Sequence, residues 1–422
     1  MNGNFSKEFV QVDLLLSSAY ARNQLDDVNM FIYALIKKEK SEKQEMIQVL
    51  IEILQRLPLF WSAWVELCKV LIDMDSKDAF EILSRLDNHW AKNFFTVNLV
   101  VENIRIHDRF EEYCFGICYG LICFFTDSNF VLTLLSIMFH NISDYDKAGV
   151  FLNQILINDP FRYENTDILS NIFYVKEKHN ELGKLAISCF ENDKYLPETC
   201  CVLGNYYSMI DDHNKAIIYF RRAIALDKNC LAAYTLLGHE YLELKNAALA
   251  IEAYNACVQI NKSDFRAWYG LGQAYELQNY MNFAIYYFLQ ALAANPRDSR
   301  MWNALSNCYE KIGKRNEAAK CLEKAEAFKD HEGISMVQLG KLYDIMNMKT
   351  RAVQCFEEIL RKREGSRIIE KDIAETLLYL ARYFKSEGDF EKAMLYATRL
   401  LDSTGNEKQE AQNIIYELNA LK

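Results

Sequence analysis

Histidine and cysteine, the side chains that most often bind metals or act as nucleophiles, follow no catalytic pattern in this chain. The seven histidines are His89, His107, His140, His179, His213, His239 and His331. No two of them have the spacing that places two metal ligands on one helix face. The sequence contains no phosphate-binding GxxxxGK(S/T), no GxSxG, no HExxH and no GxGxxG. We therefore predict a protein that is not an enzyme and needs neither a cofactor nor a metal.

The twelve cysteines in 422 residues are too sparse for a disulfide scaffold. Residues Met1–Tyr20 include acidic side chains and lack the basic-then-apolar order of a secretory leader. We therefore expect reduced cysteines that act as small core residues in a protein of the nucleus and cytoplasm. The spacing of Cys114, Cys118 and Cys123 does not fit a zinc site.

Composition excludes several other classes of protein. With 48 Lys and Arg against 58 Asp and Glu, the formal net charge is −10, which argues against nucleic-acid binding. The most apolar run, CFGICYGLICFF (Cys114–Phe125), is shorter than the ~20 residues of a membrane span, so we expect a buried or interface helix and no membrane partner. Only 15 Gly and 4 Pro are present, which favours helices over an all-β or doubly wound α/β fold.

A sequence repeat of one fixed length organises these helices. Seven leucines recur in phase at Leu135, Leu169, Leu203, Leu237, Leu271, Leu305 and Leu339. A small residue follows each leucine at Ser136, Ser170, Gly204, Gly238, Gly272, Ser306 and Gly340. An aromatic residue stands three further on at Phe139, Phe173, Tyr207, Tyr241, Tyr275, Tyr309 and Tyr343. This is the pattern of the tetratricopeptide repeat, whose length is about 34 residues, so we predict an all-α solenoid of stacked helix pairs.

The copy at Phe265–Asp298 carries every signature position of the repeat. These positions are Trp268, Leu271, Gly272, Tyr275, Ala284, Phe288, Ala291 and Pro296. Leu271 and Tyr275 share one face of a first helix, and Ala284 and Phe288 share one face of a second. Small residues let the helices approach closely, and Pro296 stops the second helix. The recurring apolar side chains are therefore core, and each pair must stack on its neighbours to bury them.

We predict three regions: divergent repeats over 1–128, regular repeats over 129–366, and a last repeat with a capping helix over 367–422. Trp64, Leu67, Cys68 and Leu71 fit the first helix of a repeat, and Leu16, Ser17 and Tyr20 fit another. Beyond a loop at residues 361–373, a further copy holds Leu380, Ala381, Phe384 and Ala393, and Glu407–Leu421 is expected to form the cap.

The first helix of each pair lines the concave face of such a solenoid, and positions 2, 5, 9 and 12 of the repeat are expected to point into it. Position 9 reads Asn171, Asn205, His239, Gln273, Asn307 and Lys341, which are mostly neutral hydrogen-bonding side chains. In the copy that begins at Tyr163, these four positions are Glu164, Asp167, Asn171 and Tyr174. Two acids and an aromatic ring would suit an arginine-bearing peptide, although a solvated helix face explains the same residues.

Two other functions remain open at this point. A co-chaperone that grips acidic chaperone tails needs basic residues at position 5, where this chain has Asp167, Cys201, Thr235, Tyr269 and Asn303. The chain could also be the regulatory array of an enzyme, but the expected capping helix at its end leaves no room for a catalytic domain.

Longer stretches carry a more specific resemblance. DKYLPETCCVLGNYYS (Asp193–Ser208), LLGHEYLELKN (Leu236–Asn246) and PRDSRMW (Pro296–Trp302) closely resemble the family of subunit 8 of the anaphase-promoting complex, a cell-cycle ubiquitin ligase. AIEAYNACVQINKSDFRAWYGLGQAYELQ (Ala250–Gln278) does so too, and PLFWSAWVELC (Pro58–Cys68) looks like the N-terminal half of that family.

The resemblance implies a non-catalytic scaffold that forms a homodimer through its N-terminal half. It also implies contacts with sister tetratricopeptide subunits and small subunits of the complex, and binding of the N-terminal peptide of a co-activator. We assign that peptide to Glu164, Asp167, Asn171 and Tyr174, and extend the polar row through Asn205, His239, Gln273 and Asn307. The long polar C-terminal tail of many relatives is not expected here, because the chain stops at Lys422.

Overall fold

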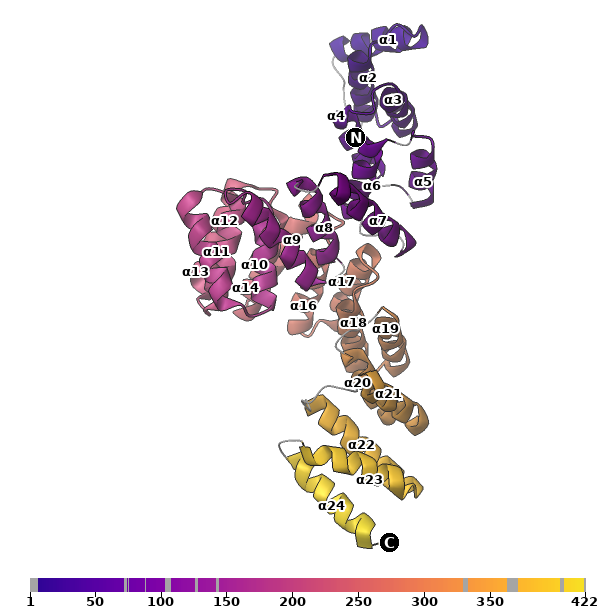
Figure 1. Cartoon of the computed structure of the whole chain (residues 1–422), viewed down its shortest axis with the longest axis vertical. Coiled ribbons are helices and arrows are strands. Elements are labelled where there is room, and N and C mark those ends of the chain that lie inside the picture. The colour runs from indigo at the N-terminus through magenta and orange to yellow at the C-terminus, as the bar shows by residue number, and fades with distance from the viewer. Residues whose placement is uncertain are drawn as a thin grey trace. The chain divides into compact units, whose positions relative to one another are not determined.

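The computed structural model describes residues 7–71, 74, 76–87, 89–102, 108–125, 128–141, 144–328, 333–362, 371–402 and 406–420. All regular secondary structure in these ranges is helical, which confirms the predicted all-α class (Figure 1). The chain divides into two compact units, residues 1–233 and 234–422. None of the described helices is both long and apolar enough to cross a bilayer.

The described residues of the N-terminal unit form a succession of helices. They are α1 (Lys7–Ala21), α2 (Asp27–Glu39), α3 (Lys43–Arg56), α4 (Trp61–Leu71), α5 (Ser76–Ser84), α6 (Trp90–Glu102), α7 (Asp108–Phe124), α8 (Asn129–Asn141), α9 (Tyr145–Asn158), α10 (Thr166–Val175), α11 (His179–Asn192), α12 (Pro197–Met209) and α13 (His213–Leu226). Helix α14 (Leu231–Glu243) begins in this unit and continues into the next.

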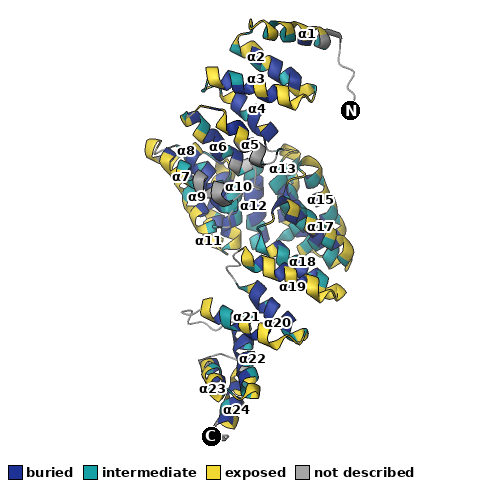
Figure 2. Ribbon diagram, turned by 90° about the vertical axis from the view of Figure 1, so that its right-hand side faces the viewer, coloured by how far each residue is buried: buried dark blue, intermediate teal, exposed yellow. Residues whose placement is uncertain are grey.

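The C-terminal unit repeats the same plan. Its helices are α15 (Ala247–Ile260), α16 (Phe265–Leu277), α17 (Met281–Ala294), α18 (Ser299–Ile312), α19 (Arg315–Ala327), α20 (Ile334–Ile345), α21 (Lys349–Lys362), α22 (Lys371–Glu387), α23 (Phe390–Arg399), a 3₁₀ turn (Leu400–Asp402) and α24 (Asn406–Ala420). Buried and exposed residues share most of these helices, as a stack of amphipathic hairpins requires (Figure 2).

The glycine that follows the repeat leucine makes room for an aromatic ring. A Cβ added to Gly272 would lie 2.4 Å from Cε1 of Phe288, which is fully buried on the second helix of the same pair. The same relation joins Gly204 with Phe220 and Gly340 with Phe356. The small residue therefore works as predicted, but the neighbour that fills its space is a ring rather than the second helix backbone.

The leucines Leu203, Leu237 and Leu271 are buried as expected, as are Tyr241 and Ala284, whereas Tyr207 and Tyr275 are half-buried. Helix α17 ends at Ala294, two residues before Pro296, so the proline stands just beyond the helix that it was expected to stop.

Three tryptophans make the same hydrogen bond near the start of a repeat. The indole Nε1 of Trp268 donates to the carbonyl oxygen of Lys262 at 2.8 Å, six residues earlier. Trp302 does the same with Pro296, and Trp64 with Pro58, both at 2.8 Å. Trp64 therefore occupies the repeat position that the sequence assigned to it.

A left-handed residue ends the first helix of six successive pairs. These residues are Glu177, Asp211, Lys245, Asn279, Gly313 and Asn347, with φ between 53° and 86°, and each stands one repeat length after the last. Glycine or asparagine usually fills such a position because other side chains are strained there. The turns could not be located from glycine spacing, since only Gly313 is a glycine.

The two ends of the chain were predicted with different success. Leu380, Ala381, Phe384 and Ala393 are buried on α22 and α23, and α24 matches the expected capping helix. At the other end, Leu16, Ser17 and Tyr20 lie on α1, but the closest helix pair joins α2 with α3. Residues 363–370 of the expected loop lie outside the described residues.

Candidate functional site

Helix α10 carries the acidic end of the predicted peptide site. Asp167 lies in its first turn and is half-buried. Glu164 was expected on the same helix, but α10 begins only at Thr166 because Asn165 takes a left-handed backbone with φ 61° at the N-cap. Glu164 therefore stands on the preceding turn, where its exposed carboxylate pairs with Arg162 at 2.7 Å. The two acids come from neighbouring segments rather than from one helix face.

Hydrogen bonds join α10 to α12 beside these acids. The Nδ2 atom of Asn205 donates to Oδ1 of Asn171 at 2.6 Å and to Oγ of Ser170 at 2.8 Å. One turn further, Oγ of Ser208 donates to Oη of Tyr174 at 3.3 Å. Asn205 is only 3% exposed, so its amide holds the two helices together and is not presented to a peptide. The ring of Tyr174 is 41% exposed and remains accessible.

The structure adds Glu198 to the site. Burial raises the pKa of the Glu198 carboxyl, and repulsion from Asp167, Asp227 and Glu164 raises it further. Three carboxyl groups therefore act on Glu198 of α12: Asp167 on α10, Glu164 on the turn before α10, and Asp227 at the C-terminal end of α13. The sequence did contain a signal for Glu198, because it stands one full repeat length after Glu164, at position 2 of the next repeat.

The predicted row continues in the C-terminal unit with His239, Gln273 and Asn307, all half-buried. The side chain of His239 forms a hydrogen bond within its own repeat, where Nδ1 lies 2.9 Å from Oη of Tyr254. Burial, assisted by the charge of Arg266, lowers the pKa of His239 to about 4. His239 is therefore a neutral imidazole near pH 7, which makes it a packing and hydrogen-bonding residue rather than a cation.

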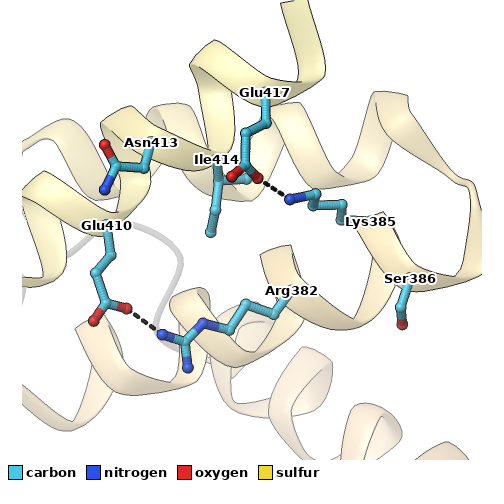
Figure 3. A pocket seen from close by; sticks show the side chains of 7 residues that line it. All are labelled: Arg382, Lys385, Ser386, Glu410, Asn413, Ile414 and Glu417. Atoms are coloured by element: carbon cyan, nitrogen blue, oxygen red, sulfur yellow. Dashed lines mark hydrogen bonds and ion pairs between the residues drawn. The ribbon is translucent and has the colours of Figure 1, made fainter. Parts of the chain in front are cut away.

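A shallow hollow of about 490 Å³ lies between α22 and α24 (Figure 3). Two ion pairs cross it, Arg382 with Glu410 and Lys385 with Glu417. The two ion pairs link α22 with α24 and neutralise one another, so the hollow offers no convergent set of reactive groups.

Comparison with family models matches two separate regions of the chain. Residues 4–136 match the model "Anaphase promoting complex subunit 8 / Cdc23". Residues 197–230, 231–264, 265–298 and 299–329 match the tetratricopeptide repeat. The boundaries of these four repeats coincide with the phase read from the leucines.

Individual relatives agree with these matches. The human protein "Cell division cycle protein 23 homolog" is 38% identical over 171 residues, which is 40% of this chain and 27% of the relative. "Anaphase-promoting complex subunit 8" of Arabidopsis thaliana is 37% identical over 188 residues, which is 44% of this chain and 30% of the relative. The matched stretch thus spans less than a third of the length of these relatives. Similarity to subunit 8 of the complex, inferred from the sequence, is confirmed.

One solved structure supports the fold. The chain in "Crystal structure of APC/C hetero-tetramer Cut9-Hcn1" aligns with a TM-score of 0.55 and 15% identity, over 97% of this chain and 87% of the other. At this identity the likeness concerns the arrangement of helices alone.

Proposed function

We propose that this chain is a non-catalytic scaffold subunit of the anaphase-promoting complex, the ubiquitin ligase of the cell cycle. The observation that carries the proposal is the match of residues 4–136 to the subunit 8 model. This match is independent of the repeat pattern at residues 197–329, which many unrelated scaffolds share. The signature leucines and alanines of the repeats, such as Leu271 and Ala284, are packed in the core, which fits a protein that works through its surfaces.

Purification from the organism's own cells tests this assignment. A tag is placed on the full chain, and the co-purifying proteins are quantified by mass spectrometry against untagged cells. We expect sister tetratricopeptide subunits and the catalytic subunits of the ligase in near-equal amounts. Recovery of chaperones alone would favour the co-chaperone alternative, and recovery of neither group would contradict the proposal. We also propose a location in both nucleus and cytoplasm, which microscopy of the tagged chain checks.

We further propose that the carboxyl cluster (Glu164, Asp167, Glu198 and Asp227), together with Tyr174 about two turns further along α10, binds an arginine-bearing peptide, the N-terminal segment of a co-activator. Burial, and after it repulsion from Asp167, Asp227 and Glu164, raises the pKa of Glu198, and a guanidinium placed beside these acids would relieve the repulsion. The exposed ring of Tyr174 offers a flat surface on which a second guanidinium can stack. Arg162 balances only part of this charge, since it pairs with Glu164.

Fluorescence anisotropy with matched peptides tests the peptide proposal. One peptide carries arginines, and its control carries citrulline, which keeps the shape but not the charge. We expect the arginine peptide to bind more tightly and to lose affinity as salt rises. An acidic chaperone-tail peptide should not compete. Equal binding of the arginine and citrulline peptides would refute the role of the carboxyl cluster.

A homodimer through the N-terminal half is the third part of the proposal. Leu14 and Leu15 on α1 are 62% and 69% exposed. Helix α7 buries Cys118 and Leu121 on one face and exposes an apolar stripe on another, formed by Gly116, Tyr119, Gly120, Cys123 and Phe124. Among the described residues, nothing lies within 4 Å of a Cβ added to either glycine, so a second helix could approach this stripe closely. Apolar faces of this kind support association with a second copy.

Sedimentation velocity of the full chain measures this association. We expect a dimer at micromolar concentration, and a monomer after Leu14→Glu with Leu15→Glu. Tyr416→Glu on α24 is the matched control, because that side chain is 79% exposed at the other end of the chain. A wild-type monomer, or equal effects of the two changes, would contradict dimerisation through the N-terminal half.

A further inference from the structure

In four repeats a cation covers the ring that stands at the aromatic position of the first helix. The Nζ or Cζ atom lies 4.9–5.8 Å from the ring centroid, and each cation stands eight residues after its ring. The pairs are Lys147 with Phe139, Lys215 with Tyr207, Arg351 with Tyr343 and Lys392 with Phe384. A covering cation at this place is therefore a recurrent feature of the chain.

An aspartate holds the covering cation in the three of these repeats that use lysine. Asp144, Asp212 and Asp389 each stand three residues before the lysine, and each pairs with its Nζ at 2.7–3.6 Å. Each aspartate also accepts the backbone N–H of that lysine at 3.2 Å, which caps the second helix of the pair. The ring is thus covered by one half of a surface ion pair.

The repeat at Phe265–Asp298 carries aromatic rings at both of these places. Phe283 stands eight residues after Tyr275, at the place of the cation, and Tyr280 stands at the place of the aspartate. The Phe283 ring stacks on Tyr275 with centroids 5.5 Å apart and an interplanar angle of 28°. The Tyr280 ring meets the Phe283 ring edge-on, at 6.4 Å and 88°. Two rings therefore replace the ion pair.

These two rings end a longer aromatic stack. Tyr275 also stacks on Tyr287, at 5.1 Å and 11°, and Tyr287 stacks on Trp268, at 6.0 Å and 23°. Tyr280 and Phe283 are 58% and 57% exposed, and the sequence of α17 contains no charged residue. The stack therefore ends on solvent-exposed rings, at the place where four other repeats supply a positive charge.

We propose that Tyr280 and Phe283 form a docking site for a lysine-bearing segment of a partner polypeptide, whose ammonium group takes the place of the covering cation. The negative face of an aromatic ring attracts a cation, and the four other repeats show that this fold accommodates one on such a ring. The formal net charge of −10 also favours the approach of a basic segment. The proposal rests on α16 and α17 alone and does not depend on the carboxyl cluster or on the assignment to the ligase.

A charge-neutral double variant tests this site. Tyr280→Asp with Phe283→Lys gives the repeat the ion pair of the others and leaves the net charge unchanged. Its melting temperature should be at least that of the wild type, because aspartate is a favoured capping residue. The probe is a fluorescein-labelled peptide of alternating lysine and glycine, and its control has every lysine acetylated. In fluorescence anisotropy with the full chain, we expect the lysine peptide to bind more tightly than its control, and the double variant to bind it about 2–5-fold more weakly than the wild type.

Fluorinated phenylalanine in place of Phe283 is a second test, because fluorine withdraws electron density from the face of the ring. We expect the affinity for the lysine peptide to fall with each added fluorine. The loss caused by the double variant should also persist in a chain that carries Glu164→Lys and Asp167→Lys, which separates this site from the carboxyl cluster.

Three results would overturn the inference. One is wild-type affinity for the lysine peptide in the folded double variant, and another is an affinity that does not respond to fluorination. The third is equal binding of the acetylated peptide, which would show that the exposed rings attract an apolar occupant rather than a cation.

Discussion

The close approach of Gly272 to Phe288 gives the sharpest stability prediction. In Gly272→Ala the new Cβ would lie 2.4 Å, 2.5 Å and 2.9 Å from three atoms of the Phe288 ring. The ring is fully buried, so it cannot swing into solvent, and α16 and α17 must separate to admit the methyl group. Overpacking of this kind costs about 1–3 kcal/mol. The better helix propensity of alanine returns up to ~1 kcal/mol, so we expect a net destabilisation of about 1–2 kcal/mol.

Hydrogen–deuterium exchange measured by mass spectrometry is the suitable assay, because a repeat array does not unfold as a single two-state unit. A loss of about 1–2 kcal/mol should speed exchange in α16 and α17 about 5–30-fold and leave α8 unchanged. Gly149→Ala is the matched control, since its Cβ would meet its nearest neighbour, Ile172, at an ordinary 3.7 Å. Phe288→Leu should reduce the effect of Gly272→Ala by making room. Unchanged or slower exchange in Gly272→Ala would show that the ring does not fill the space of the missing side chain.

Three further predictions concern charge. Changing Glu164→Lys together with Asp167→Lys should weaken binding of an arginine peptide severalfold without changing the far-ultraviolet spectrum; unchanged affinity would remove both residues from the site. The pKa of Glu198 is raised, and a bound cation favours the ionised form of its carboxyl group. The affinity for the arginine peptide should therefore rise as pH increases through that pKa. The Glu198→Gln variant should bind the peptide more weakly and show no such rise. The pKa of His239 falls to about 4 in the folded chain, against ~6.5 when unfolded. The unfolded chain therefore binds the extra proton, stability falls as pH drops from ~6.5 towards 4, and His239→Gln should melt with a smaller dependence on pH; equal dependence would contradict the burial of that imidazole beside Tyr254.

The repeat spacing predicted only part of the candidate site. The spacing correctly placed Asp167, Asn171 and Tyr174 on one first helix. It could not show that α10 begins only after Glu164, at Thr166. The left-handed backbone of Asn165 sets this start, and the repeat spacing does not encode that conformation. Nor could it show that the side-chain amide of Asn205 donates a hydrogen bond to Asn171, because that bond depends on the position of the adjacent repeat.

The class of fold, the phase of the repeats and most side chains of the core follow from the sequence alone. Each copy of the repeat encodes the same amphipathic hairpin, and such a hairpin can bury its leucines and rings only by stacking on its neighbours. Only the folded arrangement shows which polar groups remain accessible and that Glu198 lies near Asp167 and Glu164. Burial and hydrogen bonding depend on residues of neighbouring helices, and the spacing along the chain does not encode how close those residues come.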